Sequence, residues 1–417
     1  MILTPTLQYW GFKEHPFADN ILRGDLVGLF VDREIELARV EDCLGRSRVV
    51  GVHGKLGVGK SSFLHKLCEN LVKAEVPVVY VHLNADSEQT LYRELLTELL
   101  VSMEIGALHT KNMPGFKPQE EAQRLHASVA SSRGADYGAK LAGLGGNFVE
   151  NRTASYPMHT EATARESIRR IFDGIKTHTV IIFDDFEKLR YETSGKTRDY
   201  FPILSRFVST IEELLNRQNI TFVISMDDQV ERLIEAEHKK GGKFAFSLNS
   251  LCQIPTLSLD HLWEMVATRL KHYGWKGKPA DFMDDDAFYA LAVASANHPR
   301  KAVHILAEAM LCAASSKGGK RQLGADAILK GAAQARMPVD KRDWLAIQYL
   351  LKHGESSNSD DAMREHLGYQ RKTNTAYHTS VDRKLNAIAS ALRLDFEKTS
   401  TGKTVKKLLR LPKVDRS

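Results

Sequence analysis

The stretch Gly54-Lys-Leu-Gly-Val-Gly-Lys-Ser61 decides the fold of the first part of this chain. It matches the pattern GxxxxGK[ST], and it stands between an apolar run at 49–53 that predicts a strand and a helix expected from Ser61. Its glycines permit backbone angles that other residues avoid, so successive N–H groups can converge on phosphate oxygens at the helix N-terminus. The sequence therefore predicts a phosphate-binding loop.

The side chains of this loop suit separate parts of a nucleotide. Lys60 would place a cation on the terminal phosphates, and the hydroxyl of Ser61 suits Mg²⁺. ATP and Mg²⁺ are therefore the expected cofactors. The remaining expected nucleotide contacts are Gly54, Lys55, Leu56, Gly57, Val58, Gly59 and Ser62.

Two further apolar runs end in polar residues. The run at 179–183 predicts a strand buried on both sheet faces, and Asp184 and Asp185 follow it. An acidic residue opposite the phosphate loop can hold Mg²⁺, and its neighbour can orient the water that attacks the γ-phosphate. We expect these roles for Asp184 and Asp185. Ser225 ends the next predicted strand, 220–224, where it would sense the γ-phosphate. Turn residues are the alternative in each case.

The rest of the chain supports a parallel α/β sheet followed by helices. A strand at 76–83, a helix at about 90–103 and helices at 161–176 and 200–216 alternate with the runs above, which predicts crossover connections. An edge strand is expected within 246–254. After 257 the pattern is helical, at 260–272, 284–294 and 299–313. The polar, glycine-rich segment 106–159 is interpreted as an insertion, either a hairpin or a partly disordered loop.

Composition bounds the class of protein. The chain has 417 residues, of which 43% are hydrophobic and 26% charged, as in folded proteins of two or three domains. No apolar run approaches the roughly 18 residues of a membrane helix, and the N-terminus lacks the pattern of an export signal. The cysteines lie far apart without CxxC, so neither a disulfide framework nor a zinc site is expected. These features favour a cytoplasmic protein without a membrane partner.

The order of these pieces resembles an AAA+ ATPase, and within that class the replication-initiator type of the origin-recognition ATPases. The resemblance covers about residues 10–415. It rests on the phosphate loop, FVDRE at 30–34, VIIFDD ending at Asp185, the strand ending at Ser225, and ANHPRK at 296–301. It implies a helical lid in which Arg300 contacts the γ-phosphate, so that nucleotide state sets the lid angle. An ordinary surface arginine is the alternative for Arg300.

The sequence also departs from that family. Its members usually have Glu after the metal-binding Asp, whereas Asp185 stands there and Glu187 lies two residues on, so slow hydrolysis is expected. The family's trans-acting arginine has no clear counterpart. Arg232 is the candidate, with a solvated helix residue as the alternative. The insertion at 106–159 looks more like inserts of prokaryotic ATPases used in signalling, defence or transposition.

Positive charge is concentrated at the C-terminal end. Residues 341–417 hold 16 Lys and Arg against 9 Asp and Glu, a net charge of +7. The whole chain has a net charge of only +6, so the positive surplus lies in this segment. Helices at about 340–353, 360–367 and 374–392 and a hairpin at 394–411 resemble a winged helix-turn-helix, which the same family often carries. The expected DNA contacts are Arg371, Lys372, Tyr377, His378, Arg383 and Lys384, with Lys398, Lys403, Lys406 and Lys407 on the hairpin.

Together these features predict an α/β P-loop NTPase of the AAA+ type. The expected domains are a nucleotide-binding domain at 1–255, a helical lid at 256–338 and a winged helix at 339–417. We expect an ATPase that assembles on duplex DNA under nucleotide control, as a homo-oligomer or with a partner protein. One alternative is a signalling or anti-phage-defence ATPase whose winged helix contacts a protein. Another is a nucleotide-binding scaffold without turnover.

Overall fold

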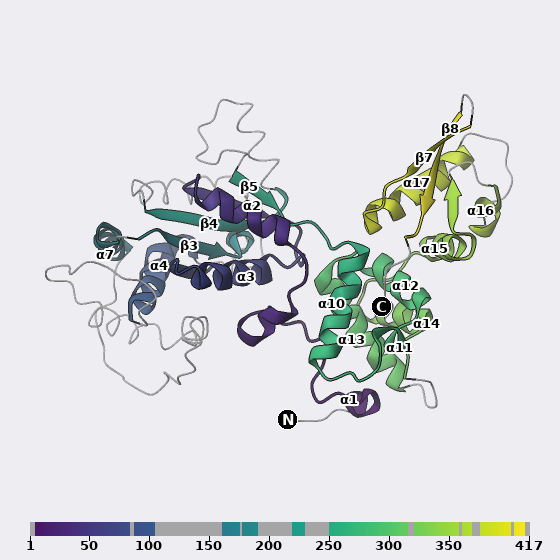
Figure 1. The fold of residues 1–417 in the computed structure, drawn as a ribbon, viewed down its shortest axis with the longest axis horizontal. Coiled ribbons are helices and arrows are strands. Elements are labelled where there is room, and N and C mark those ends of the chain that lie inside the picture. The colour runs from purple at the N-terminus through teal and green to yellow at the C-terminus, as the bar shows by residue number, and fades with distance from the viewer. Residues whose placement is uncertain are drawn as a thin grey trace. The chain divides into compact units, whose positions relative to one another are not determined.

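The structure is a computed structural model that describes residues 5–83, 87–104, 161–175, 177–190, 219–229, 250–315, 321–357, 361–368, 376–401 and 404–412. The predicted insertion, the predicted helix at 200–216 and Arg232 lie outside the described residues. The chain divides into two units (Figure 1). One is Ile21–Pro255, and the other joins Met1–Asn20 to Thr256–Ser417. The first 20 residues thus group with the C-terminal half, whereas they were expected in the nucleotide-binding domain.

A five-stranded parallel sheet forms the centre of the unit Ile21–Pro255. Its order is β2-β3-β4-β1-β5. The strands are β1 (Val49–His53), β2 (Val78–His82), β3 (Thr179–Asp184), β4 (Ile220–Met226) and β5 (Leu251–Gln253). All five run in one direction, so the segments after β1, β3 and β4 leave the same edge, where ligands bind in such sheets. This confirms the predicted α/β P-loop fold.

Helices cover both faces of this sheet (Figure 1). On one face α2 (Glu34–Leu44) packs on β1 and β5 and α3 (Lys60–Lys73) packs on β2 and β3, around a core that includes Val180 and Ile182 of β3. On the other face α4 (Ser87–Glu104) packs on β2 and against α7 (Glu161–Gly174), around a core that includes Ile181 and Phe183 of β3. Successive side chains of a strand point to opposite faces, which explains why β3 is apolar throughout. Each fully buried side chain of this kind contributes about 1.5–3 kcal/mol.

The second unit begins with a cluster of helices. They are α1 (Pro5–Trp10), α10 (Leu259–His272), α11 (Pro279–Phe282), α12 (Asp285–Ser295), α13 (Pro299–Ser315) and α14 (Ala325–Gln334). Trp10 fixes α1 to the cluster, because its indole Nε1 donates to Met310 O and its ring lies 5.0 Å from that of Phe282. Ser258 caps α10 by accepting from the N–H of His261. The N-terminal segment therefore completes this core.

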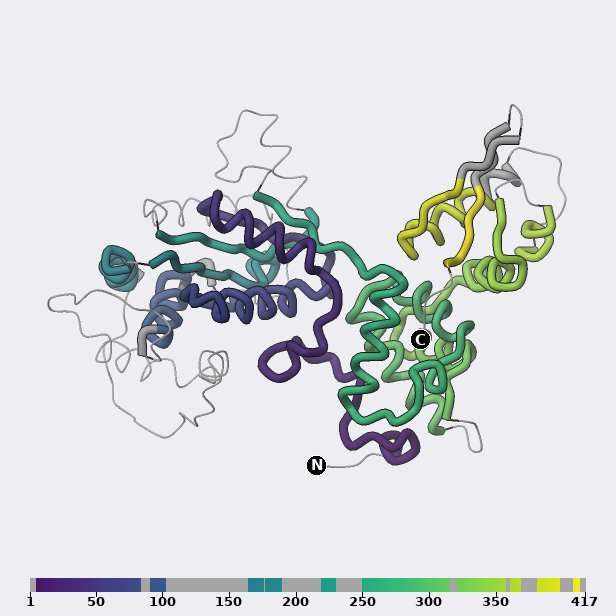
Figure 2. Tube along the Cα trace, viewed as in Figure 1, coloured from purple at the N-terminus to yellow at the C-terminus, as the bar shows by residue number. Residues whose placement is uncertain are grey.

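The C-terminal end of the second unit combines helices with a small antiparallel sheet. The elements are α15 (Lys341–His353), β6 (Glu355–Ser357), α16 (Asp361–His366), α17 (Ala376–Leu392), β7 (Glu397–Thr401) and β8 (Thr404–Arg410). Figure 2 traces this path in green and yellow. The strand order is β6-β8-β7. The hairpin β7–β8 was expected, whereas β6 was not. In the described part of the chain, no helix is long and apolar enough to cross a membrane.

Candidate nucleotide-binding site

The phosphate loop joins β1 to α3 with the backbone that its glycines permit. Gly57 and Gly59 have φ values of 86° and 98°, in the left-handed region that favours glycine. At Gly54 a Cβ atom would lie 2.7 Å from the carbonyl oxygen of Ile254, so only glycine fits there without a shift. Because α3 starts at Lys60, the N–H groups of its first turn have no partner within the helix and are free to face an anion.

Lys60 is turned into the loop rather than towards solvent. Its side chain is 6% exposed, and Nζ donates to Gly54 O at 3.0 Å. Nζ also lies 3.0 Å from Glu187 Oε1, whose side chain is 12% exposed. Phosphate oxygens could replace the carboxylate oxygen as partners of this ammonium group, so the residues fit a nucleotide phosphate.

The other predicted loop contacts differ in exposure. Val58 is buried and its N–H donates to Lys55 O at 3.3 Å, whereas Leu56 is exposed. Ser61 is half-buried at the helix start, where its hydroxyl can serve a metal ion. Ser62 Oγ accepts from the N–H of Leu22 at 3.2 Å, so this hydroxyl also holds the segment before α2.

Asp184 is fixed by donors from neighbouring strands. It is buried at the end of β3, and its Oδ2 accepts from the Tyr80 hydroxyl of β2 at 2.6 Å. Its Oδ1 accepts from Ser225 Oγ of β4 at 2.7 Å and from the N–H of Asp185 at 2.8 Å. Ser225 also accepts from the N–H of Asp185 at 2.9 Å. Ser225 therefore lies beside Asp184, as expected, and its fully buried hydroxyl is committed to this carboxylate rather than open to a phosphate.

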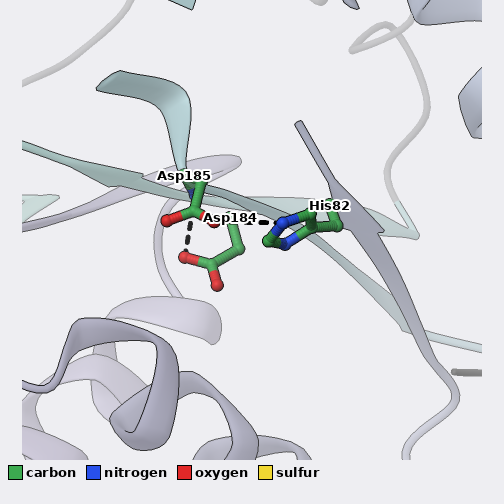
Figure 3. Close-up of side chains that lie close together, drawn as sticks. All are labelled: His82, Asp184 and Asp185. Carbon is green, nitrogen blue, oxygen red and sulfur yellow. Dashed lines mark hydrogen bonds and ion pairs between the residues drawn. The ribbon is translucent and has the colours of Figure 1, made fainter. Parts of the chain in front are cut away.

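The carboxylate of Asp185 is bound to basic neighbours. Its Oδ2 lies 2.6 Å from Lys188 Nζ and 3.2 Å from His82 Nε2, and Lys188 Nζ lies 3.0 Å from His82 Nε2. An ammonium group can only donate, so Lys188 bridges the carboxylate and the imidazole. Asp185 has a φ of 62°, in the left-handed region, and its carboxylate is joined to the ring of His82 (Figure 3).

These residues include a candidate cation site. One ligand atom each of His82, Asp184 and Asp185 lies within 4.8 Å of the others. Mg²⁺ prefers oxygen ligands, whereas imidazole suits transition metals. The ammonium of Lys188 already neutralises Asp185. Asp184 and Ser61 offer the oxygen ligands that Mg²⁺ prefers, and their predicted role as metal ligands stays a prediction.

Burial shifts the pKa of several groups near Asp184. Desolvation raises the pKa of Glu187, and the charge of Lys60 partly offsets this. Burial lowers the pKa of His65 to about 4, although Asp184 acts in the opposite direction. The ring of His65 stacks on Tyr80 with centroids 4.7 Å apart. Burial, and then the charge of Asp184, raise the pKa of Tyr80, so its hydroxyl stays a donor to Asp184.

The sequence assigned no role in this site to four of its side chains. Tyr80 and His82 belong to β2, and Glu187 and Lys188 belong to the short 3-10 helix η2 (Phe186–Arg190). The signal for the first two was the appearance of polar residues at alternate positions near the end of an apolar strand. Their approach to Asp184 depends on β2 pairing with β3, in a register that sets His82 opposite Asp184.

Arg300 lies in the second unit, near the start of α13. Its Nε is 3.1 Å from both carboxylate oxygens of Asp19, and its side chain is 52% exposed. Asp19 belongs to the N-terminal segment of the same unit. The predicted contact between Arg300 and the γ-phosphate stays a prediction.

The predicted DNA contacts are described in part. Arg383 is exposed on α17. Lys384 on the same helix is engaged within the protein, because its Nζ lies 2.6 Å from Asp343 and 3.4 Å from Asp340. Its side chain is 20% exposed. Arg371, Lys372 and Lys403 lie outside the described residues, as do the side chains of Tyr377, His378, Lys398, Lys406 and Lys407.

The family comparison adds to this geometry. Residues 30–276, more than half of the chain, match the family model of an ATPase domain found predominantly in Archaea. The chain belongs to this ATPase family. The matched residues include the whole five-stranded sheet, the phosphate loop and the residues around Asp184. No curated protein matches the sequence.

Solved structures that match this one include the ORC2 protein of Aeropyrum pernix in its ADPNP–ADP complexes. It is 13% identical, with 96% of this chain and 95% of that chain covered and a TM-score of 0.41. A Walker-type ATPase of Pyrococcus abyssi is 14% identical, with 91% and 100% covered and a TM-score of 0.41. At these values, membership of the ATPase family rests on the family model alone.

Proposed function

We propose that this protein binds and hydrolyses Mg·ATP and uses the nucleotide state to control its assembly on duplex DNA, as an ATPase of the AAA+ type. The observation that carries the nucleotide part is the buried Lys60 in a glycine loop on the same sheet edge as Asp184. A cation, free helix N–H groups and a fixed carboxylate are what a triphosphate and its metal ion require.

Each residue of the site has a role in this proposal. Lys60 binds the β- and γ-phosphates, and the loop N–H groups surround the β-phosphate. Ser61 and Asp184 hold Mg²⁺, which when bound neutralises charge on the phosphates. Ser225 and Tyr80 fix the carboxylate of Asp184 through their hydroxyl groups. Arg300 reports the γ-phosphate to the lid.

The DNA part of the proposal is supported by the C-terminal elements and their charge. The helices α15, α16 and α17 precede the hairpin β7–β8, as in a winged helix, and α17 is the helix that would enter the major groove. Arg383 is exposed on α17 and available to a phosphate or a base. Basic residues that contact DNA phosphates give affinity that falls steeply with salt.

Binding of the full-length protein to duplex DNA across a salt series tests this part. Arg383→Ala is expected to weaken binding and to reduce the slope of log K against log salt by about one. Lys276→Ala removes an exposed positive charge outside the C-terminal elements and is the matched control, which should leave both unchanged. Equal DNA affinity for the wild type and Arg383→Ala would contradict the proposal.

A second function is favoured by one observation. Lys384, one of the expected DNA contacts, forms ion pairs with Asp340 and Asp343. Its charge is therefore already compensated within the protein. A C-terminal unit that contacts a protein partner, as in signalling or defence ATPases, would need fewer free cations on α17. Absence of salt-dependent DNA binding by the wild type would favour this function.

A further inference from the structure

The two carboxylates that follow Asp184 lie in different electrostatic surroundings. Asp185 is bound to Lys188 at 2.6 Å and lies beside His82. Glu187 is bound to Lys60, the predicted phosphate-binding lysine, at 3.0 Å. Oδ2 of Asp185 is thus already paired with two basic side chains that have no assigned phosphate role. The residue next to Asp184 in sequence is thus not the carboxylate next to the phosphate-binding lysine in space.

Glu187 is held firmly in this position. It belongs to η2, whose Phe186 and Leu189 side chains are fully buried in the sheet core. The N–H of Lys188 donates to Asp185 O at 2.8 Å, which closes the turn after β3. The side chain of Glu187 therefore projects to the phosphate loop from a fixed backbone rather than from a mobile loop.

One oxygen of Glu187 is unused. Oε1 contacts Lys60, whereas Oε2 is buried and accepts no hydrogen bond from any other residue that the structure describes. A buried acceptor without a donor is costly, so such an oxygen is suited to accept a hydrogen bond from a water molecule. The position beside Lys60 is also where the terminal phosphate of a bound nucleotide belongs.

We propose that Glu187, rather than Asp185, is the carboxylate that serves the phosphate site, by holding Lys60 in the empty protein and orienting the attacking water once Lys60 has moved to the phosphates. This inference rests on the proposed ATP hydrolysis. The water oxygen forms a bond to the γ-phosphorus while the bond from phosphorus to the bridging oxygen breaks, and ADP leaves with that electron pair. The proton of the water passes to Glu187 Oε2 and then to inorganic phosphate.

The proposal predicts opposite effects on binding and on turnover. In Glu187→Gln the amide no longer competes with phosphate for Lys60, so we expect the dissociation constant of Mg·ATP to fall by roughly 3- to 10-fold. Without the carboxylate to accept a proton, turnover at saturating ATP should fall by about 100-fold or more. A residue with only a structural role would weaken binding and turnover together.

The matched variant is Asp185→Asn, measured on the full-length protein by calorimetry and by phosphate release. We expect it to keep the wild-type affinity for Mg·ATP and to retain most of the turnover. Glu187→Asp keeps the negative charge on a shorter side chain, so its ATP affinity should lie closer to the wild-type value. This rescue would show that the effect of Glu187→Gln comes from the lost charge and not from misfolding. Tighter binding with lost turnover in Glu187→Gln alone supports the proposal.

Other outcomes overturn it. Unchanged turnover in Glu187→Gln, or loss of turnover in Asp185→Asn with Glu187→Gln active, assigns the water to another carboxylate. A wild type that binds Mg·ATP without releasing phosphate contradicts the proposed hydrolysis instead. In that case the role of Glu187 is tested by ATP affinity only. Equal affinity of the wild type and Glu187→Gln for Mg·ATP then overturns the role of Glu187.

Discussion

His65 shows how strongly burial acts on single residues beside the site. Its ring is 5% exposed and stacks on Tyr80, which in turn donates to Asp184. Desolvation lowers the pKa of His65 from 6.5 to about 4. The unfolded chain therefore takes up a proton at this residue below about pH 6.5, whereas the folded protein does so only near pH 4. Stability is present above pH 6.5 and is lost as the pH falls through this interval.

On going from pH 7 to pH 4.5, the free energy of unfolding of the wild type should fall by about 2 kcal/mol more than that of His65→Phe. Phenylalanine keeps the stacking on Tyr80 and cannot be protonated. Urea unfolding at the two pH values measures the difference. His304→Phe, at an exposed histidine of α13, is the control and should show no such gain. Parallel pH profiles for the wild type and His65→Phe would refute this assignment.

Among single residues, those placed by a local motif could be predicted from the sequence, whereas those placed by a contact between strands could not. Lys60 and Asp184 follow from local spacing, because loop geometry and strand ends place them. The partners of Asp185, His82 and Lys188, meet it only because β2 pairs with β3. Strand order is a property of the whole sheet, so a single sequence does not contain it in readable form.

The same division holds for whole elements. The strands β1, β3 and β4 were predicted because both faces of the sheet are buried and their residues are continuously apolar. The strand β6 was missed because Glu355–Ser357 has no strand pattern and becomes a strand only by pairing with β8. The helix α14 was missed as well, although it packs closely on α13.

The packing of α13 and α14 supplies a prediction at this scale. A Cβ atom on Gly331 would lie 2.6 Å from Ala309 N and 2.7 Å from Ile305 O, both in the backbone of α13. Gly331→Ala must therefore separate the helices, and we expect it to lower the free energy of unfolding by about 1–3 kcal/mol.

Thermal and urea unfolding would measure this change. Gly324→Ala, at the N-terminal cap of the same helix, is the control, because the nearest atom to its Cβ is a side-chain oxygen of Asp284 at 3.6 Å. The close approach would be disproved if the Gly331 and Gly324 variants unfolded alike.

At the scale of the whole molecule, the proposal requires the two units to respond together to ATP. Arg300 and Asp19 form an exposed ion pair within the second unit, and such pairs contribute at most about 1 kcal/mol. The stability of the protein should therefore change little when either residue is replaced. The reason to study Arg300 is its proposed contact with the γ-phosphate.

We expect Arg300→Ala to remove the ATP-dependent shift in sedimentation coefficient that the wild type should show. Asp19→Asn breaks the same ion pair but leaves the guanidinium in place, so it should keep the shift. An ATP-dependent shift that survives in Arg300→Ala would exclude this arginine as the reporter of the γ-phosphate.

The loop from Gly54 to Ser61 is proposed to bind a magnesium-bound triphosphate, and isothermal calorimetry of Mg·ATP with the full-length protein measures this binding. We predict saturable heat for the wild type and for Lys73→Ala, which removes an exposed lysine from the same helix. Lys60→Ala should weaken binding by roughly 100-fold or more, because a buried cation beside the phosphates is lost. Absence of heat with the wild type, or equal binding by Lys60→Ala, would contradict the account.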